Sequence, residues 1–124
     1  MLVSVIIPIF NEKYTIKATL QSFINQKGIA KKDYEIIVVD GESTDGSTGF
    51  VEELMEKNDF IRLINNNKRY MPHGFNIGLS NSSGEYVMVA SGHCMVDENY
   101  ISNAISLIKE KKVECVSGVM KTIQ

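Results

Sequence analysis

The sequence has no tryptophan, few prolines and few cysteines, and no apolar run long enough to cross a membrane. A membrane-spanning helix needs roughly 20 consecutive apolar residues, which the opening apolar stretch does not provide. A basic start followed by a cleavage site, the mark of a secretory signal, is also missing. These absences favour a cytoplasmic location. They also allow a full-length protein that lies at the inner face of the membrane.

Charge and cysteine content exclude further classes of protein. The 13 Lys and Arg residues against 15 Asp and Glu residues give a net charge of −2, so no basic surface for nucleic acid is expected. Cys94 and Cys115 have neither metal-type spacing nor the density of a disulfide scaffold, and we expect reduced, packed thiols. A length of 124 residues is typical of a single domain.

Strand-like and helix-like segments alternate, which predicts an α/β fold with a mostly parallel, Rossmann-like sheet and flanking helices. The predicted strands are the apolar run that opens the chain at Val3 and the segments 35–39, 60–64, 85–90 and 113–119. Apolar residues at helical spacing are Ile16, Leu20, Phe23 and Ile24, then Phe50, Val51, Leu54 and Met55, and finally Ile101, Ala104, Ile105 and Ile108.

The remaining local features are loops and helix caps. Residues 65–74 are predicted to form a loop, and residues 74–82 a short helix with Phe75 and Leu79 facing inward. Ser43, Thr44, Asp45 and Asp97 are residue types that cap helices. The sequence stops soon after the segment 113–119 without a linker or tail. We interpret the chain as a fold that is cut within its sheet, which would expose apolar surface and favour homo-oligomers.

Two predicted strands end in polar residues that can bind a ligand. The first strand runs through Pro8 and Phe10 into Asn11 and Glu12, and the second ends at Asp40. Open α/β sheets bind ligands at the carboxyl ends of such strands. The carbonyls around Pro8 can accept hydrogen bonds from a base or ribose, and Asp40 can accept from the imide N–H of uracil or thymine or from the N–H pair of guanine.

Each of these residues also has a structural interpretation. Phe10 can stack on a base or pack in the core. Asp40 can bind a ligand or hold its own turn. Glu12 can lie near the nucleotide or complement the N-terminus of the following helix. In the loop 65–74, Lys68 and Arg69 can approach a diphosphate or remain solvated.

The two strand ends resemble the family 2 glycosyltransferases of GT-A fold, whose pattern is an apolar strand ending in Pro-x-Tyr/Phe-Asn-Glu and, downstream, Val-Val-Asp-x-x-Ser-x-Asp-Gly-Ser/Thr. Asn76 with Gly78, followed by Ser83-Gly84-Glu85-Tyr86, extends the resemblance to residues 2–119. It implies a nucleotide-sugar-binding GT-A sheet, with Pro8, Phe10, Glu12, Asp40, Asn76 and Ser91 at the nucleotide. Structural roles for Asn76, Gly78 and Gly84 stay open.

The resemblance also implies a divalent cation, Mn²⁺ or Mg²⁺, at the end of the fourth predicted strand. Family members hold it there with Asp-x-Asp, whereas this chain has Ser91, Gly92 and His93. A variant in succinoglycan-type exopolysaccharide transferases, Asp-Ala-His-Cys, is similar except for Ser91. An imidazole can bind Mn²⁺, but a serine hydroxyl is a poor substitute for a carboxylate, so His93 is the expected metal ligand. His93 as a hydrogen-bonded loop histidine is the alternative.

The implied activity is transfer of a sugar, with inversion, from a nucleotide-diphosphate sugar to a saccharide or lipid-linked acceptor in exopolysaccharide or cell-surface glycan synthesis. In family members the acceptor half and the general base lie beyond the position of Gln124, so we expect no transfer by this chain alone. A dinucleotide oxidoreductase or a P-loop NTPase is disfavoured because their glycine-rich motifs are missing. The remaining rival is a non-catalytic nucleotide-binding module.

Overall fold

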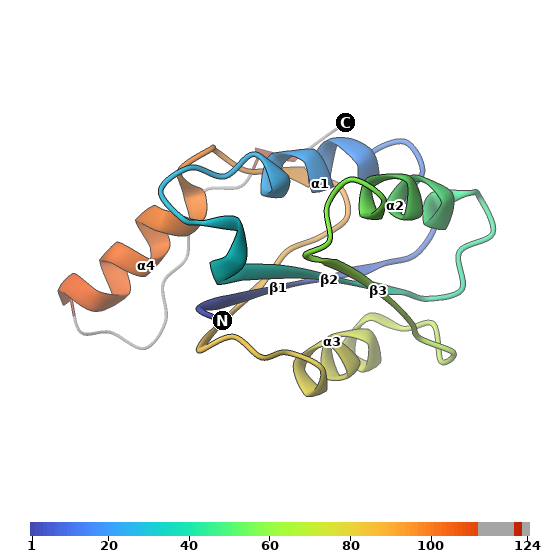
Figure 1. The fold of residues 1–124 in the computed structure, drawn as a ribbon. Coiled ribbons are helices and arrows are strands. Elements are labelled where there is room, and N and C mark those ends of the chain that lie inside the picture. Colours follow the sequence, from blue (N-terminus) through green and yellow to red (C-terminus); the bar gives the residue numbers. More distant parts are fainter. Residues whose placement is uncertain (112–120, 123–124) are drawn as a thin grey trace.

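A computed structural model describes residues 1–111 and 121–122 of the chain. Four parallel strands form a sheet in the order β3-β2-β1-β4, with α1 and α2 on one face and α3 on the other (Figure 1). The strands are β1 Val3–Ile9, β2 Tyr34–Asp40, β3 Ile61–Asn65 and β4 Tyr86–Val89. The helices are α1 Ile16–Ile24, α2 Ser47–Met55, α3 Met71–Ser80 and α4 Tyr100–Lys111, with a 3-10 turn, η1, at Lys31–Asp33. This architecture confirms the predicted α/β fold.

The core lies on both faces of β1 and β2, which are buried along their whole length. Parallel strands that are covered on both faces need continuous apolar sequence, and this explains the unbroken apolar run at the start of the chain. The predicted inner face of α1 is confirmed, since its four apolar residues Ile16, Leu20, Phe23 and Ile24 are all buried. On α2, Val51 and Leu54 are buried whereas Phe50 is exposed.

The strand order places a topological switch point between β1 and β4. The chain moves from β1 to β2 and then to β3 in one direction, and β4 returns to the opposite side of β1. The carboxyl ends of strands at such a switch point are where open α/β sheets bind ligands.

Helix α3 packs closely against the sheet at Gly78, which is the structural role that the sequence left open for this glycine. It begins at Met71, earlier than the predicted start at residue 74, and Pro72 in its first turn suits that start. The buried positions are Gly74 and Gly78, while Leu79 is 44% exposed. The prediction that Leu79 faces inward is therefore wrong, because the glycine edge of the helix contacts the sheet. Phe75 is partly buried against Ile6, Ile37 and Val39, as predicted.

The segment after β4 crosses back to α1. Strand β5, Cys94–Met95, pairs antiparallel with β6, Lys121–Thr122. Helix α4 lies beside the loop that follows α1, where the Ile101 N–H donates to Gln26 Oε1 at 2.9 Å. Asp97 binds the backbone N–H of Asn99 just before α4, which agrees with its predicted capping role. The predicted strand 113–119, with Cys115, lies outside the described residues.

Cys94 is buried and free, as predicted, and burial raises the pKa of its thiol. In the part of the chain that the structure describes, no helix is long and apolar enough to span a membrane.

A buried polar cluster lies near the amino ends of β1 and β2, away from the crevice. The Glu35 carboxylate is 5% exposed and accepts hydrogen bonds from Ser4 Oγ at 2.6 Å and from the Ser83 N–H at 2.9 Å. Arg62 Nη1 completes the cluster at 3.1 Å from Glu35 Oε1. The Ser4 hydroxyl in turn accepts from the Gly84 N–H at 2.7 Å, so the cluster ties the α3–β4 loop to the sheet.

Candidate nucleotide-binding site

Two loops at the carboxyl edge of the sheet are joined by hydrogen bonds. Three successive backbone N–H groups of the β1–α1 loop donate to side-chain oxygens of the β2–α2 loop and of the first residue of α2. The pairs are Asn11 to Ser43 Oγ (2.8 Å), Glu12 to Ser47 Oγ (2.8 Å) and Lys13 to Asp45 Oδ2 (3.1 Å). The small polar residues after Asp40 thus align the two strand ends. Their predicted role as helix caps is corrected in part, because Gly46 occupies the N-cap of α2, although Asp45 also binds the Ser47 N–H.

Asp40 closes the turn at the end of β2. It lies opposite Ile9 in the register of the sheet and is 5% exposed. Its carboxylate accepts from the Ser43 N–H at 3.1 Å and from Ser43 Oγ at 2.5 Å. Asp40 therefore holds its own turn, which was the structural alternative to ligand binding. A carboxylate offers about four acceptor positions, so this geometry also leaves capacity for a ligand N–H, and the nucleotide role stays a prediction.

Phe10 follows β1 directly and is 43% exposed. Core packing, the structural alternative for this ring, does not occur. An exposed aromatic ring at the carboxyl end of a central strand is available to stack on a planar base. Asn11 takes the left-handed conformation with a φ of 51°, which turns the chain sharply after Phe10.

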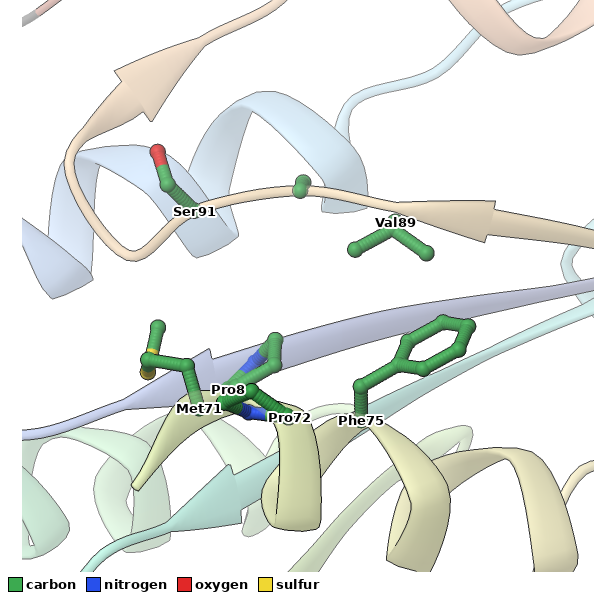
Figure 2. Close-up of a pocket in the computed structure, with 7 residues that line it drawn as sticks. Pro8, Met71, Pro72, Phe75, Val89 and Ser91 are labelled. Carbon is green, nitrogen blue, oxygen red and sulfur yellow. The ribbon is translucent and has the colours of Figure 1, made fainter. Parts of the chain in front are cut away.

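A cavity of about 440 Å³ opens at the switch point between β1, β4 and the start of α3 (Figure 2). Its lining is almost entirely apolar and consists of Pro8, Met71, Pro72, Phe75, Val89, Ala90 and Ser91. Figure 2 shows that the Ser91 hydroxyl points away from Pro8 and Met71. Pro8 and Ser91 thus line the same cavity, whereas Asn76 is exposed on α3 and does not line it, and the nucleotide roles of all three stay predictions.

The turn after β4 is held against α1 through its central glycine. The Gly92 carbonyl accepts from Thr15 Oγ1 at 2.8 Å and from Thr19 Oγ1 at 3.1 Å. A Cβ at position 92 would lie 2.7 Å from Ile9 Cγ2, so a larger residue does not fit there. Sequence reasoning missed the two threonines, because their partner is a backbone carbonyl more than 70 residues away.

Glu12 and His93 meet across the crevice, although they lie on different loops. His93 Nδ1 is 3.2 Å from Glu12 Oε1, and the two side chains are 49% and 20% exposed. The Glu12 carboxylate also accepts from Oγ1 of Thr15, the N-cap residue of α1, at 3.3 Å, so the helix-complementing alternative stays open beside the nucleotide role. Residues 1–111 and 121–122 contain no group of three or more His, Cys, Asp or Glu side chains that could hold a metal ion.

The loop before α3 brings two further residues to the site. Arg69 has a φ of 66° and its Nε lies 3.2 Å from Glu42 Oε1 in an exposed ion pair. Such a pair is weak and can exchange for a stronger anion. Asn66, which sequence reasoning missed, is 2% exposed and donates its backbone N–H to the Asp40 carbonyl at 2.7 Å. Its side chain bonds the Tyr70 carbonyl at 3.0 Å and fixes the loop.

Comparison of the chain with known proteins identifies one family. The model of Glycosyl transferase family 2 matches residues 4–124. Over an alignment of 128 residues, the chain is 32% identical to a dolichyl N-acetyl-alpha-D-glucosaminyl phosphate 3-beta-D-2,3-diacetamido-2,3-dideoxy-beta-D-glucuronosyltransferase of Methanococcus voltae, with 98% of this chain and 40% of the relative covered.

Two solved structures share the fold. The mannosyltransferase PcManGT of Pyrobaculum calidifontis, in complex with GDP-Man and Mn²⁺, superposes with a TM-score of 0.82 and 26% identity over 94% of this chain and 35% of its own. S. aureus TarS in complex with UDP-GlcNAc superposes with a TM-score of 0.78 and 26% identity over 89% of this chain and 32% of its own. The chain therefore spans about two fifths or less of the length of these relatives.

Proposed function

Since the chain belongs to glycosyl transferase family 2, we propose that it forms the nucleotide-sugar-binding part of an enzyme that transfers sugar, with inversion, to a saccharide or lipid-linked acceptor. The relatives named above are glycosyltransferases, and glycosyl transfer is the activity of the family. A role in exopolysaccharide or cell-surface glycan synthesis and a cytoplasmic location belong to the same proposal.

The observation that carries the proposal is the arrangement at the carboxyl edge of the sheet. Phe10 is open for stacking, the Asp40 carboxylate lies at the next strand end, and the two loops that carry them are fixed to each other. A base that stacks on Phe10 would present its N–H to Asp40, and the diphosphate would then extend toward Arg69 or His93. Solved neighbours hold UDP-GlcNAc and GDP-Man, which supports a nucleotide sugar as the ligand.

The donor set at the crevice fits a divalent cation that is shared with a diphosphate. An imidazole nitrogen on His93 and a carboxylate on Glu12 are both suitable ligands for Mn²⁺. A bound cation would neutralise the charge that develops on the departing diphosphate. His93 would hold the cation, while Phe10 and Asp40 would orient the base. No described residue is assigned as the general base.

Titration of the 124-residue chain with UDP, dTDP and GDP by calorimetry tests the proposal. Asp40→Asn keeps an acceptor for Ser43 and removes the charge. We expect it to weaken nucleotide binding by about 1.5–3 kcal/mol, the contribution of a hydrogen bond to a charged group. Asp59→Asn, a change at an exposed aspartate outside the site, is the control. Equal nucleotide affinities for wild type and Asp40→Asn would refute the pocket assignment.

The alternative function is a nucleotide-binding module without catalysis. It differs from the enzyme in whether product forms once an acceptor is supplied. We propose that these 124 residues by themselves bind donor without transferring sugar, because they span only about two fifths of the M. voltae relative. Positioning and proton removal each supply large rate factors, the latter about 10² to 10⁴. Steady formation of glycosidic product by the isolated chain would contradict this.

A further inference from the structure

We propose that Glu12 and His93 together form the protein's part of a divalent-cation site, with Glu12 replacing the carboxylate that is missing at Ser91. This inference rests on the proposed binding of a nucleotide sugar, and it assigns a cation ligand on the β1–α1 loop. The sequence pattern had pointed only to the turn after β4, where His93 is the one suitable side chain.

The distance between the two side chains fits neighbouring ligands of one cation. His93 Nδ1 and Glu12 Oε1 are 3.2 Å apart. Two ligands that lie at about 2.1 Å from a cation and at a right angle to each other are about 3.0 Å apart. A cation can therefore bridge the two atoms in octahedral geometry with only a small adjustment of either side chain.

Both ligands are oriented by contacts of their own. The second carboxylate oxygen of Glu12 accepts from Thr15 Oγ1 at 3.3 Å, and the Glu12 N–H donates to Ser47 Oγ at 2.8 Å. The turn that carries His93 is fixed through the two threonine bonds to the Gly92 carbonyl. Outer contacts of this kind commonly hold metal ligands in position.

Two protein ligands are sufficient for such a site. Magnesium-type sites that act on phosphates commonly use one or two protein ligands, and the substrate's phosphate oxygens and water complete the shell. Ser91 contributes little, since a neutral hydroxyl binds a hard cation weakly and in Figure 2 it points away from the cavity. The 49% exposure of the His93 side chain leaves room for phosphate and water on the open side.

Electron paramagnetic resonance of Mn²⁺ measures cation binding directly, with and without UDP. The decisive variant is Glu12→Gln, because glutamine keeps a hydrogen-bond acceptor for the His93 ring but loses the negative charge. His93→Ala removes the second ligand, and Glu56→Gln changes an exposed glutamate outside the site as the matched control. Thermal unfolding verifies that every variant is folded, and UDP binding in EDTA reports the nucleotide site without a cation.

We expect Glu12→Gln and His93→Ala each to weaken Mn²⁺ binding in the presence of UDP by at least about tenfold, the loss that removal of an outer contact already causes. UDP binding in EDTA is measured for each variant as well, so that a loss of direct nucleotide contact is separated from the loss of the cation, which should be the larger of the two. Wild-type Mn²⁺ affinity in either variant overturns the proposed ligand pair, even if UDP still binds. Absence of UDP binding in the wild type, with and without Mn²⁺, would instead refute the proposed function.

Discussion

Gly78 on α3 lies so close to Ile6 on β1 that a Cβ at position 78 would fall 2.4 Å from Ile6 Cγ2. Real Cβ atoms do not approach other atoms so closely, and Ile6 is fully buried and cannot move away. The glycine therefore sets the distance between α3 and the sheet. Because Met71, Pro72 and Phe75 of the same helix line the cavity, this distance also determines the width of the candidate site.

Gly78→Ala should consequently destabilise the protein. Overpacking of a filled core costs about 1–3 kcal/mol, and thermal or urea unfolding measures the loss. Gly49→Ala is the matched control, because Gly49 lies within α2 and a Cβ there meets no atom within 4 Å. We expect that control to be neutral or to stabilise by up to about 1 kcal/mol, since alanine favours helix. Equal stability of the two variants would contradict the close approach of α3.

The Glu35 cluster makes stability depend on pH. Burial raises the pKa of the Glu35 carboxyl, but the hydrogen bonds from Ser4, Ser83 and Arg62 outweigh it and leave the pKa below its ordinary value of 4.5. A lowered pKa in the folded state means that the stabilisation is complete above pH 4.5 and is lost as the pH falls through the folded-state pKa. Urea unfolding from pH 7 to pH 3 should show this loss.

Glu35→Gln should remove most of that pH dependence. At pH 7 we expect a loss of about 1–3 kcal/mol, because the change weakens hydrogen bonds to a buried charge. Glu56→Gln, at an exposed position, serves as the control and should keep the wild-type pH profile. A pH profile of Glu35→Gln that matches the wild type below pH 4.5 would show that other carboxyls dominate acid unfolding.

The fold could be predicted because its signals are local. Apolar runs and helical spacing determine where β1, β2 and α1 form, and those segments agree with the structure closely. The helix α3 was predicted less well, since its sheet-facing edge is made of Gly74 and Gly78, which carry no hydrophobic signal. Leu79 was assigned inward by spacing, yet the close contact of the glycines rotates it to the surface.

The sequence indicates candidate site residues only where a motif marks a strand end. Pro8 and Ser91 line one cavity and Asp40 lies at the end of a neighbouring strand, as expected from a parallel sheet. The pairing of Glu12 with His93 joins positions 81 residues apart, and no local pattern encodes it. Likewise, Asn66 is one of three consecutive asparagines in the sequence, and only the fold shows that it is buried.

Asp45 should stabilise the contact between the two loops at the site. Burial raises the pKa of its carboxyl, but hydrogen bonds from Ser47 and from the Lys13 N–H leave the pKa below its ordinary value. Asp45→Ala should cost about 0.5–1.5 kcal/mol at pH 7, the net contribution of a typical hydrogen bond, because solvent screens the charge of this partly exposed carboxylate. Asp59→Ala is the exposed control. Unfolding midpoints that are the same for both variants would show that the loops do not depend on Asp45.

Phe10 should matter more for nucleotide binding than for folding. The residue is 43% exposed, so Phe10→Ala removes a partly buried ring, and we expect a loss of stability of about 1 kcal/mol. Loss of a base–aromatic stack should weaken UDP binding by about 1–3 kcal/mol, which calorimetry measures. Tyr14→Ala is the matched control, because Tyr14 lies on the same loop and is 89% exposed.

The comparison of these two aromatic variants separates stacking from a general effect on the loop. Both remove an exposed ring from the β1–α1 loop, but only Phe10 directly follows the strand that ends beside Asp40. A loss of UDP affinity in Phe10→Ala alone supports stacking at this position. Equal affinity losses in both variants would assign the effect to the conformation of the loop, and wild-type affinity in Phe10→Ala would place the base elsewhere in the crevice.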